Sequence, residues 1–218
     1  MSKIETVPLN SDQGAVSARV TDTVSEIGGW VKKAKRGNRH ACNQLAEQFQ
    51  DSIFKMVFYR IRSRSDAEDL TQEIFLQAFK NLSRLKQDER FKSWLFSIAL
   101  NRVRDYYRKK KLRSFFMTSI ESEEKVGRTP EKKDDGSAGA LQRVIRKDFW
   151  KQVDMLLGKM SKMEREVFRL RFMDQLSIRE VSLVLKRNES TVKTHLYRGI
   201  QKFRKEASMR DFLQEVVS

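Results

Sequence analysis

The chain has 218 residues, of which 39% are hydrophobic, and it carries 45 Lys and Arg against 29 Asp and Glu, a formal net charge of +16. This excess predicts a polyanionic partner, because Lys and Arg that neutralise phosphates gain affinity from the counterions they release. An anionic membrane would also fit the charge, but the sequence has no run of about 18 apolar residues and no signal-peptide pattern. We therefore expect a soluble, cytoplasmic protein that does not insert stably into membranes.

The sequence contains few residues that could form a metal site or a catalytic site. Its single cysteine, Cys42, excludes an internal disulfide, and with only His40 and His195 a Cys/His zinc site would be short of ligands. Cys42 is interpreted as a small core residue, the alternative being a redox switch. Since no nucleophile and base pair, phosphate-binding glycine loop or metal cluster is present, we expect no catalytic residues, no metal and no cofactor.

The first part of the chain predicts an extension followed by helices. Residues 1–28 have sparse, aperiodic apolar positions and are expected to form a flexible extension. From Trp30 to Ile61, apolar residues recur at three- and four-residue spacings, which predicts amphipathic helices with a turn near Gly37 and Asn38.

An acidic helix is predicted from about residue 65, where Ser65 and Glu68 have the spacing of a capping box, to about residue 82. Its apolar positions form one stripe, which leaves Asp69, Gln72 and Glu73 largely outside it. An acidic surface is a poor place to hold nucleic acid, so in this basic chain it indicates a separate protein partner. The stripe consists of Leu70, Ile74, Phe75, Ala78, Phe79 and Leu82.

The next predicted helix, from residue 91 to about residue 111, is rich in aromatic and basic residues. Asn101, Arg104, Asp105 and Arg108 fall together on one face. Aromatic rings can stack on unpaired bases while guanidinium groups follow the backbone, the combination expected of a single-strand binder. The alternative is that Trp94 and Tyr106 are core residues beneath a solvated basic face. The predicted inward face consists of Leu95, Ile98, Ala99, Val103 and Tyr106.

Helical periodicity fades after this helix and then returns. Gly127, Pro130 and a run of small and acidic residues predict a linker, after which helices are expected over 141–157, 163–172, 177–185 and 188 to about 206. No strand pattern competes, so we predict an all-α chain of two small helical domains. The predicted parts are an extension over 1–28, a first domain over 29–112, a flexible linker over 113–140, a second domain over 141–207 and a tail over 208–218.

The last two predicted helices have the pattern of a helix-turn-helix. Lys186 and Arg187 make the turn, and Asn188 is the expected N-cap of the second helix. Basic side chains in this stretch are opposed only by Glu189, so attraction to phosphate is ample. The alternative is plain surface charge on a domain that contacts protein. The outward residues of the second helix suit a major groove and include Ser190, Lys193, Thr194, Tyr197, Arg198 and Gln201.

The first domain carries an ordered set of motifs: Gly37 with Ala41, Asp66-Ala67-Glu68-Asp69 with Gln72 and Phe75, and Phe91-x-Ser93-Trp94-Leu95-x-x-Ile98-Ala99-x-Asn101-x-x-x-Asp105-x-x-Arg108. This set resembles region 2 of the extracytoplasmic function sigma factors of bacterial RNA polymerase. In that family the acidic helix binds the clamp of the polymerase beta-prime subunit, which here implies contacts by Asp66, Asp69, Gln72 and Glu73.

The same resemblance implies that the following loop and helix melt the downstream promoter element. Pulling a base from the stack costs a few kcal/mol, so a melting protein needs a pocket and charges that bind only the opened strand. The loop over residues 87–90 would lie beside the captured base. The implied promoter contacts are Asn101, Arg104, Tyr107, Arg108 and Lys109.

The second domain resembles region 4 of the same family, through Glu164-Arg165-Glu166-Val167-Phe168-x-Leu170-Arg171-Phe172, Leu176-Ser177-x-x-Glu180-Val181 and Ser190-Thr191-Val192-Lys193-Thr194-x-Leu196-x-Arg198. The resemblance implies that Ser190, Thr191, Lys193, Thr194, Tyr197 and Arg198 read the upstream, minus-thirty-five promoter element. Two residues depart from the family pattern, Lys186 where glycine is frequent and Arg187 where an aliphatic residue is usual. A left-handed Lys186 would cost roughly 1 kcal/mol, so either the turn differs or the strain is tolerated.

Together the two blocks imply a sigma factor that binds core polymerase through the beta-prime clamp and the beta flap, recognises promoter DNA and directs its melting and transcription initiation. An anti-sigma factor is a further partner that the resemblance implies. One alternative is a stand-alone helix-turn-helix regulator with an N-terminal sensor or dimerisation domain, which leaves the acidic helix unexplained. Another is an anionic-membrane or RNA-binding adaptor that uses the charge without promoter specificity.

Overall fold

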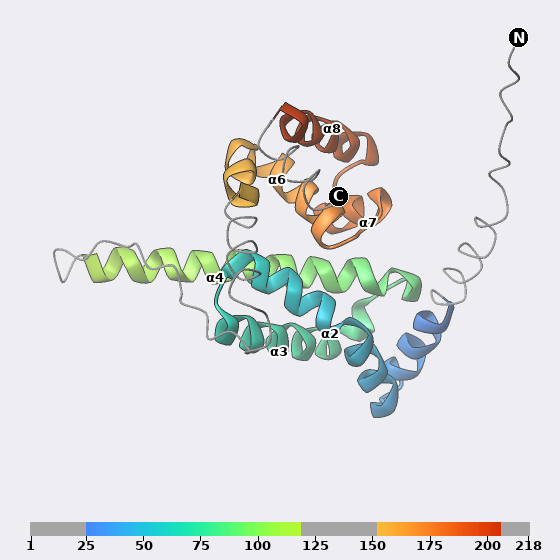
Figure 1. Ribbon diagram of the computed structural model, residues 1–218. Coiled ribbons are helices and arrows are strands. Elements are labelled where there is room, and N and C mark those ends of the chain that lie inside the picture. The colour runs from blue at the N-terminus through green and yellow to red at the C-terminus, as the bar shows by residue number, and fades with distance from the viewer. Residues whose placement is uncertain (1–24, 119–151, 206–218) are drawn as a thin grey trace, which may run out of the picture.

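The computed structural model describes residues 25–118 and 152–205, and every regular element in these two ranges is helical. Figure 1 shows two helical bodies, one containing α2, α3 and α4 and the other containing α6, α7 and α8. The predicted all-α fold with two helical domains is confirmed. Residues 1–24, 119–151 and 206–218, which hold most of the expected extension, most of the expected linker and the tail, lie outside the described residues.

The first domain is built from helical residues 25–35 and three further helices, α2 (Arg39–Ile61), α3 (Arg64–Lys80) and α4 (Phe91–Thr118). Short 3-10 turns over Leu82–Arg84 and Asp88–Arg90 connect α3 to α4. The expected turn precedes α2, where Gly37 has a φ of 85° that favours glycine. Asn38 then caps α2, because its side-chain oxygen accepts the amide of Ala41.

Three boundaries differ from the sequence prediction. Residues 25–28 are already helical, and α4 continues over residues 113–118 into the expected linker. The predicted capping box of Ser65 and Glu68 is wrong. Ser63 has the extended conformation of an N-cap and accepts the amide of Asp66, while Glu68 pairs with Arg64 at 2.9 Å. The cap thus begins the helix two residues earlier than predicted.

The core of the first domain lies between α4 and the pair of helices α2 and α3. The Phe91 ring packs on the Phe49 ring of α2 with centroids 5.6 Å apart, and both side chains are buried. Leu95, Ala99 and Val103 of the predicted inward face are also buried. Apolar burial at this spacing on α4 accounts for the position of the helix across its neighbours.

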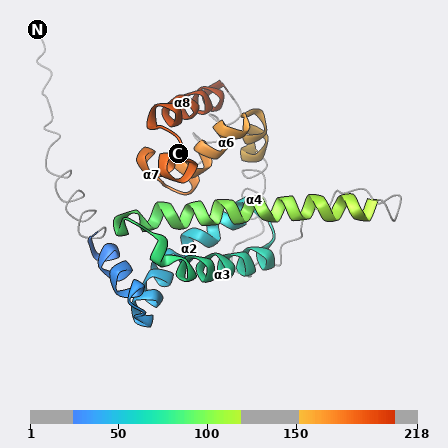
Figure 2. The same ribbon diagram turned by 180° about the vertical axis from the view of Figure 1, so that it is seen from behind.

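A second apolar face of α4 was missed by the sequence interpretation. Phe96 and Leu100 are each only 1% exposed, although neither belongs to the predicted inward face. Nine residues at 100° each turn a helix by two and a half turns, so Leu100 lies opposite Phe91. Helix α4 also contacts α7 of the second domain (Figure 2), and the buried cluster that contains Phe96 and Leu100 includes residues of both domains. Helix α4 is therefore covered on two sides.

The second domain contains helical residues 152–159, α6 (Lys162–Phe168), a π-helical segment (Arg169–Met173), α7 (Ile178–Leu185) and α8 (Glu189–Lys205). Capping boxes begin α6 and α7, where Ser161 pairs with Glu164 and Ser177 pairs with Glu180. A small apolar cluster joins its first helix to α6 and α8. The cluster contains Leu156, Leu157 and Met160, with Val153, Phe168 and Phe203 packed against it.

The turn of the helix-turn-helix is made by a strained lysine. Lys186 has φ 52° and ψ 49°, the left-handed region, and its amide donates to carbonyls at the end of α7. The amide of Arg187 donates to Ser182 O at 3.0 Å. Of the two outcomes that the sequence left open, the turn keeps the left-handed geometry and tolerates a strain of roughly 1 kcal/mol. Helix α8 begins directly after Asn188.

Candidate polymerase and promoter interfaces

The acidic face of α3 carries three of the four residues predicted to bind polymerase. Asp69, Gln72 and Glu73 are exposed and lie on one side of the helix, away from its buried stripe. Glu73 is 3.8 Å from the guanidinium of Arg102 on α4. Asp66 differs, because it is half-buried and its carboxylate accepts a hydrogen bond from Tyr106 at 2.7 Å. The structure therefore brings Asp69, Gln72 and Glu73 together but engages Asp66 with α4.

Leu76 is a member of this face that the sequence interpretation missed. It is 71% exposed, and it lies three or four residues after Gln72 and Glu73, on the same side of α3. The signal was visible in the sequence, since Leu76 falls outside the apolar stripe of the helix. An exposed leucine among carboxylates gives the face an apolar centre of the kind that protein interfaces use. We call Asp69, Gln72, Glu73 and Leu76 the α3 face.

Tyr106 is a structural residue rather than a free stacking platform. Burial and the hydrogen bond to the Asp66 carboxylate raise its pKa to about 12, since both favour the protonated phenol. Trp94 is half-buried and its ring lies 6.0 Å from that of Phe91. The alternative interpretation of these two aromatics, as residues packed against the core, agrees with the structure.

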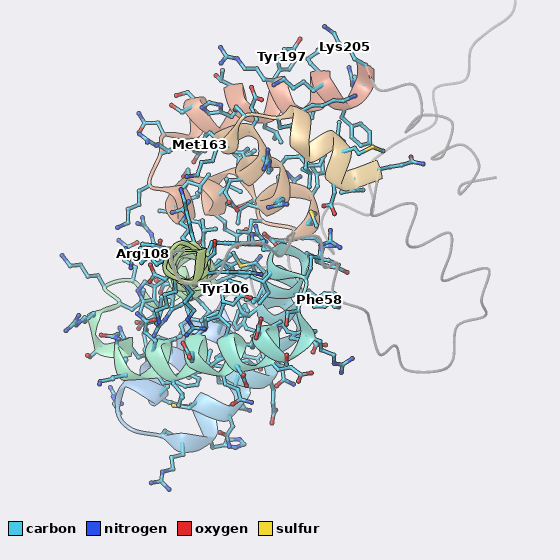
Figure 3. All side chains as sticks on the ribbon, turned by 90° about the vertical axis from the view of Figure 1, so that its left-hand side faces the viewer. Phe58, Tyr106, Arg108, Met163, Tyr197 and Lys205 are labelled. Carbon is cyan, nitrogen blue, oxygen red and sulfur yellow. The ribbon has the colours of Figure 1, made fainter. Side chains whose placement is uncertain are left out.

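Three of the predicted downstream-promoter residues share one exposed face of α4. Asn101, Arg104 and Arg108 are all exposed, and Arg108 forms an ion pair with Asp105, three residues earlier on the helix, at 3.1 Å. Figure 3 views α4 end on, with the first domain below it and the second above it. The face lies on neither of these covered sides, so it is open to a ligand. We call Asn101, Arg104 and Arg108 the α4 face.

Tyr107 and Lys109 do not join the α4 face. Each is turned by about 100° from Arg108, in opposite directions around the helix. The Tyr107 hydroxyl donates to the carbonyl of Arg60 at the end of α2, although Tyr107 is 46% exposed. Burial raises the pKa of Tyr107, so its hydroxyl remains a donor at neutral pH. Lys109 is exposed, and the C-terminal part of α4 projects past α2 and α3 (Figure 1).

The loop before α4 is held against the first helix of the domain. Lys35 donates to Leu85 O at 2.6 Å and pairs with the Asp88 carboxylate at 2.5 Å. Gln87, Glu89 and Arg90 are exposed around this anchor. The loop over residues 87–90 is thus held through Leu85 and Asp88, while its other side chains are exposed. It lies at the N-terminal end of the helix that carries the α4 face.

Helix α8 presents a polar face to solvent. Val192 is buried beneath it, Thr191 is half-buried, and Tyr197 is 64% exposed (Figure 3). The Thr194 hydroxyl donates to the Ser190 carbonyl at 3.0 Å, which leaves its oxygen free to accept. The structure therefore places all six predicted residues along one helix, with Thr191 at the edge. The exposed members, which we call the α8 face, are Ser190, Lys193, Thr194, Tyr197 and Arg198.

Within residues 25–118 and 152–205, no group of three or more His, Cys, Asp and Glu side chains is arranged to hold a metal ion. None of the helices in these ranges is long and apolar enough to cross a membrane.

Comparison with known proteins assigns both domains. Residues 45–113 match the family Sigma-70 region 2, and residues 150–203 match the family Sigma-70, region 4. The ECF RNA polymerase sigma factor SigW of Bacillus subtilis is 26% identical over 176 residues, covering 81% of this chain and 94% of SigW. The ECF RNA polymerase sigma factor BldN of Streptomyces coelicolor is 29% identical over 174 residues, covering 78% of this chain and 62% of BldN.

The fold is also shared with a solved structure. CnrH, solved in complex with the cytosolic domain of CnrY, matches with a TM-score of 0.60 at 23% identity, over 82% of this chain and 95% of that one. Both family matches fall on the two helical bodies, in the order that the sequence motifs predicted. The chain therefore belongs to the sigma-70 family, as a sigma factor of its extracytoplasmic function group.

Proposed function

We propose that this protein acts in the cytoplasm by binding core RNA polymerase through the α3 face and promoter DNA through the α4 and α8 faces. The observation that carries the proposal is the separation of charge. An acidic face and a basic face lie on adjacent helices of one domain, and a second basic face lies on the other domain. A protein that bound only DNA would gain nothing from the acidic face, since phosphates repel it.

The α3 face supplies polar and apolar contacts to the polymerase clamp. Asp69 and Glu73 provide charges that steer a basic partner, and Gln72 provides both a donor and an acceptor. Leu76 would be covered at the centre of the contact, where burying its side chain favours association. Asp66 acts indirectly in this scheme, by holding Tyr106 and thus the angle between α3 and α4.

The two basic faces take different DNA targets. The α4 face would follow the backbone of the opened downstream element, with the anchored loop over residues 87–90 beside a flipped base. The α8 face would lie in the major groove of the upstream element, with Arg198 and Lys193 available to base edges or phosphates. Polymerase supplies the chemistry, so the role of this chain is recognition and melting rather than catalysis.

Protein partners of the second domain complete the proposal. The beta flap of polymerase would hold the second domain over the upstream element, as the family resemblance implies. An anti-sigma factor would inhibit by covering the same faces, and CnrH was itself solved with a bound partner, the cytosolic domain of CnrY.

Co-purification with core polymerase tests the docking face. Asp69→Lys should reduce recovery of polymerase by at least about tenfold, because it puts a positive charge where a basic partner binds. Glu47→Lys is the matched control, since it makes the same charge change at an exposed position of α2 outside the face. Equal loss in both variants would mean that net charge, not the α3 face, governs binding. If neither wild type nor control bound polymerase, the stand-alone regulator would replace this proposal.

A further inference from the structure

A lysine of the first helix of the domain holds the loop before α4 at two points. Lys35 lies at the end of helical residues 25–35, and its ammonium donates to the Leu85 carbonyl at 2.6 Å. The same ammonium pairs with the Asp88 carboxylate at 2.5 Å. The side chains of Lys35 and Asp88 are only 23% and 13% exposed, so this ion pair is partly withdrawn from water. One side chain thus joins the first helix to a loop 50 residues later.

The two contacts lie on either side of an exposed loop tip. Leu85 is buried, and Asp88 begins the second 3-10 turn before α4. Only Lys86 and Gln87 lie between these two residues, and both are exposed. We call Lys86 and Gln87 the loop tip. Lys35 therefore fixes the residues before and after the loop tip while the tip itself stays open to a ligand.

Two buried supports carry the loop. On one side, the amide of Phe91 donates to the Asp88 carbonyl, and Phe91 is fully buried at the start of α4. On the other side, Val31 and Ala34 are buried and fasten the first helix to the core of the domain. Lys35 connects the loop to this second support. The loop tip is therefore positioned relative to the helix that carries the α4 face.

The geometry of Lys35 differs from that of an ordinary surface ion pair, which contributes little to stability. Its ammonium has three donors, and two of them bond to two residues of the same short loop. A loop that moves freely loses conformational entropy when it binds a ligand, whereas a held loop has lost that entropy on folding. The two contacts therefore favour binding by the loop tip more than they favour the fold.

We propose that Lys35 is a positioning residue for base capture, which holds the loop tip in the conformation that receives the flipped base of the opened strand. Lys35 touches no DNA in this scheme and acts through Leu85 and Asp88. The first helix is thereby part of the machinery that opens the promoter. This role rests on the proposed function, because that function places the loop over residues 87–90 beside the captured base.

Hydrogen exchange of the free full-length chain tests whether Lys35 holds the loop. Lys35→Met removes the ammonium and keeps a side chain of similar length. The amides of Leu85 and Arg90, which are bonded within the loop, should then exchange about tenfold faster, as expected for the loss of hydrogen bonds to a charged group. Lys33→Met is the matched control and should leave these amides unchanged. It makes the same change at an exposed position about 160° away around the same helix.

Abasic templates test whether the held loop captures a base. A promoter found from start sites that depend on the protein would be prepared with its downstream element pre-opened and with one abasic site at each position of the opened strand in turn. With polymerase and the unmodified protein, one position should lose affinity by about tenfold when its base is absent. In Lys35→Met that loss should shrink to about twofold, because a mobile loop gains little from the base.

The ratio between intact and abasic templates separates positioning from folding. A general loss of folded protein would weaken binding to every template by the same factor and leave this ratio unchanged. Lys35→Arg keeps a cation with several donors, so it should restore the dependence on the captured base. Asp88→Ala removes one of the two contacts from the loop side, and it should reduce the dependence even if Lys35→Met fails to fold.

The outcomes distinguish the role of Lys35 from the proposed function. Unchanged exchange of the loop amides in Lys35→Met would overturn the role of Lys35 while leaving polymerase binding and promoter recognition intact. A dependence on the captured base that is equally strong in folded Lys35→Met would do the same. If no position of the opened strand depended on its base in the unmodified protein, base capture would be wrong, and the role of Lys35 with it.

Discussion

The two domains share apolar burial but differ in the polar contacts at their helix ends. The first domain packs three long helices around a large buried core that includes Phe49 and Phe91 and continues into Leu170 and Val181 of the second domain. The second uses shorter helices with two capping boxes, and Lys202 of α8 bonds to Glu164 of α6 at 2.6 Å. This bond and the Ser161 amide hold the pKa of Glu164 below its ordinary value. The small second domain thus adds polar contacts at its helix ends to the apolar burial that it shares with the first domain.

The same contrast extends to the binding faces. In the first domain, acidic and basic faces lie on neighbouring helices, and Tyr106 and Arg102 link those helices through Asp66 and Glu73. In the second, α8 combines a basic exposed face with a single acid in its first turn, Glu189. The first domain is therefore built to hold two partners of opposite charge, whereas α8 is suited to one.

The largest expected effect is on the core of the first domain. Phe91→Ala should lower its free energy of unfolding by about 3–5 kcal/mol, because the ring is fully buried against Phe49. Urea denaturation followed by circular dichroism would measure this loss. Phe172→Ala, at a half-exposed aromatic of the second domain, is the comparison and should cost much less. Equal losses would contradict the stated difference between the domains.

A smaller effect is expected at the α8 face. Arg198→Ala should weaken upstream-element binding by about 1–3 kcal/mol, as expected for loss of a base or phosphate contact. Polymerase binding should be unchanged, because Arg198 lies on the other domain from the α3 face. A gel-shift titration at fixed salt measures the first quantity and co-purification the second. Loss of both would assign Arg198 to folding rather than to DNA.

The strained turn gives a stabilising prediction. Lys186→Gly should raise the stability of the second domain by up to about 1 kcal/mol, since glycine adopts the left-handed conformation without a side-chain clash. Thermal denaturation of the full chain would detect the shift. Arg187→Gly is the neighbouring control and should give no gain, because Arg187 is not among the residues with positive φ. A gain in both variants would point to charge removal instead.

The smallest expected effect is at high pH. The pKa of Tyr106 is raised from 10.0 to about 12 in the folded protein, so its contribution to stability is present below pH 10 and lost as the pH rises toward 12. Tyr106→Phe should reduce the slope of stability against pH in that window. Denaturation at several alkaline pH values measures the slope. An unchanged slope would mean that the hydrogen bond to Asp66 does not persist in solution.

Local patterns predicted the helices and most exposed faces, because helical spacing separates buried from solvent-facing positions. The Asp69, Gln72 and Glu73 set, the Asn101, Arg104 and Arg108 set and most of the α8 face were all found this way. The shift of the α3 cap to Ser63 depended on which serine adopts extended backbone, a choice that spacing alone does not decide.

The remaining differences arise from contacts between segments far apart in the sequence. Phe96 and Leu100 belong to neither predicted face of α4, and they lie in a buried cluster that also includes residues of the second domain. Tyr107 was grouped with the promoter residues by the motif, but its hydroxyl bonds to the carbonyl of Arg60. The pairing of Arg60 with Asp174 joins residues 114 positions apart, beyond any local pattern.

The most direct test of the central claim is transcription by core polymerase on fragmented genomic DNA, with and without this protein. The account predicts discrete start sites that require the protein, that disappear with Asp69→Lys and persist with Glu47→Lys. Start sites that form equally well without the protein, or that survive Asp69→Lys unchanged, would contradict promoter recognition through polymerase bound at the α3 face.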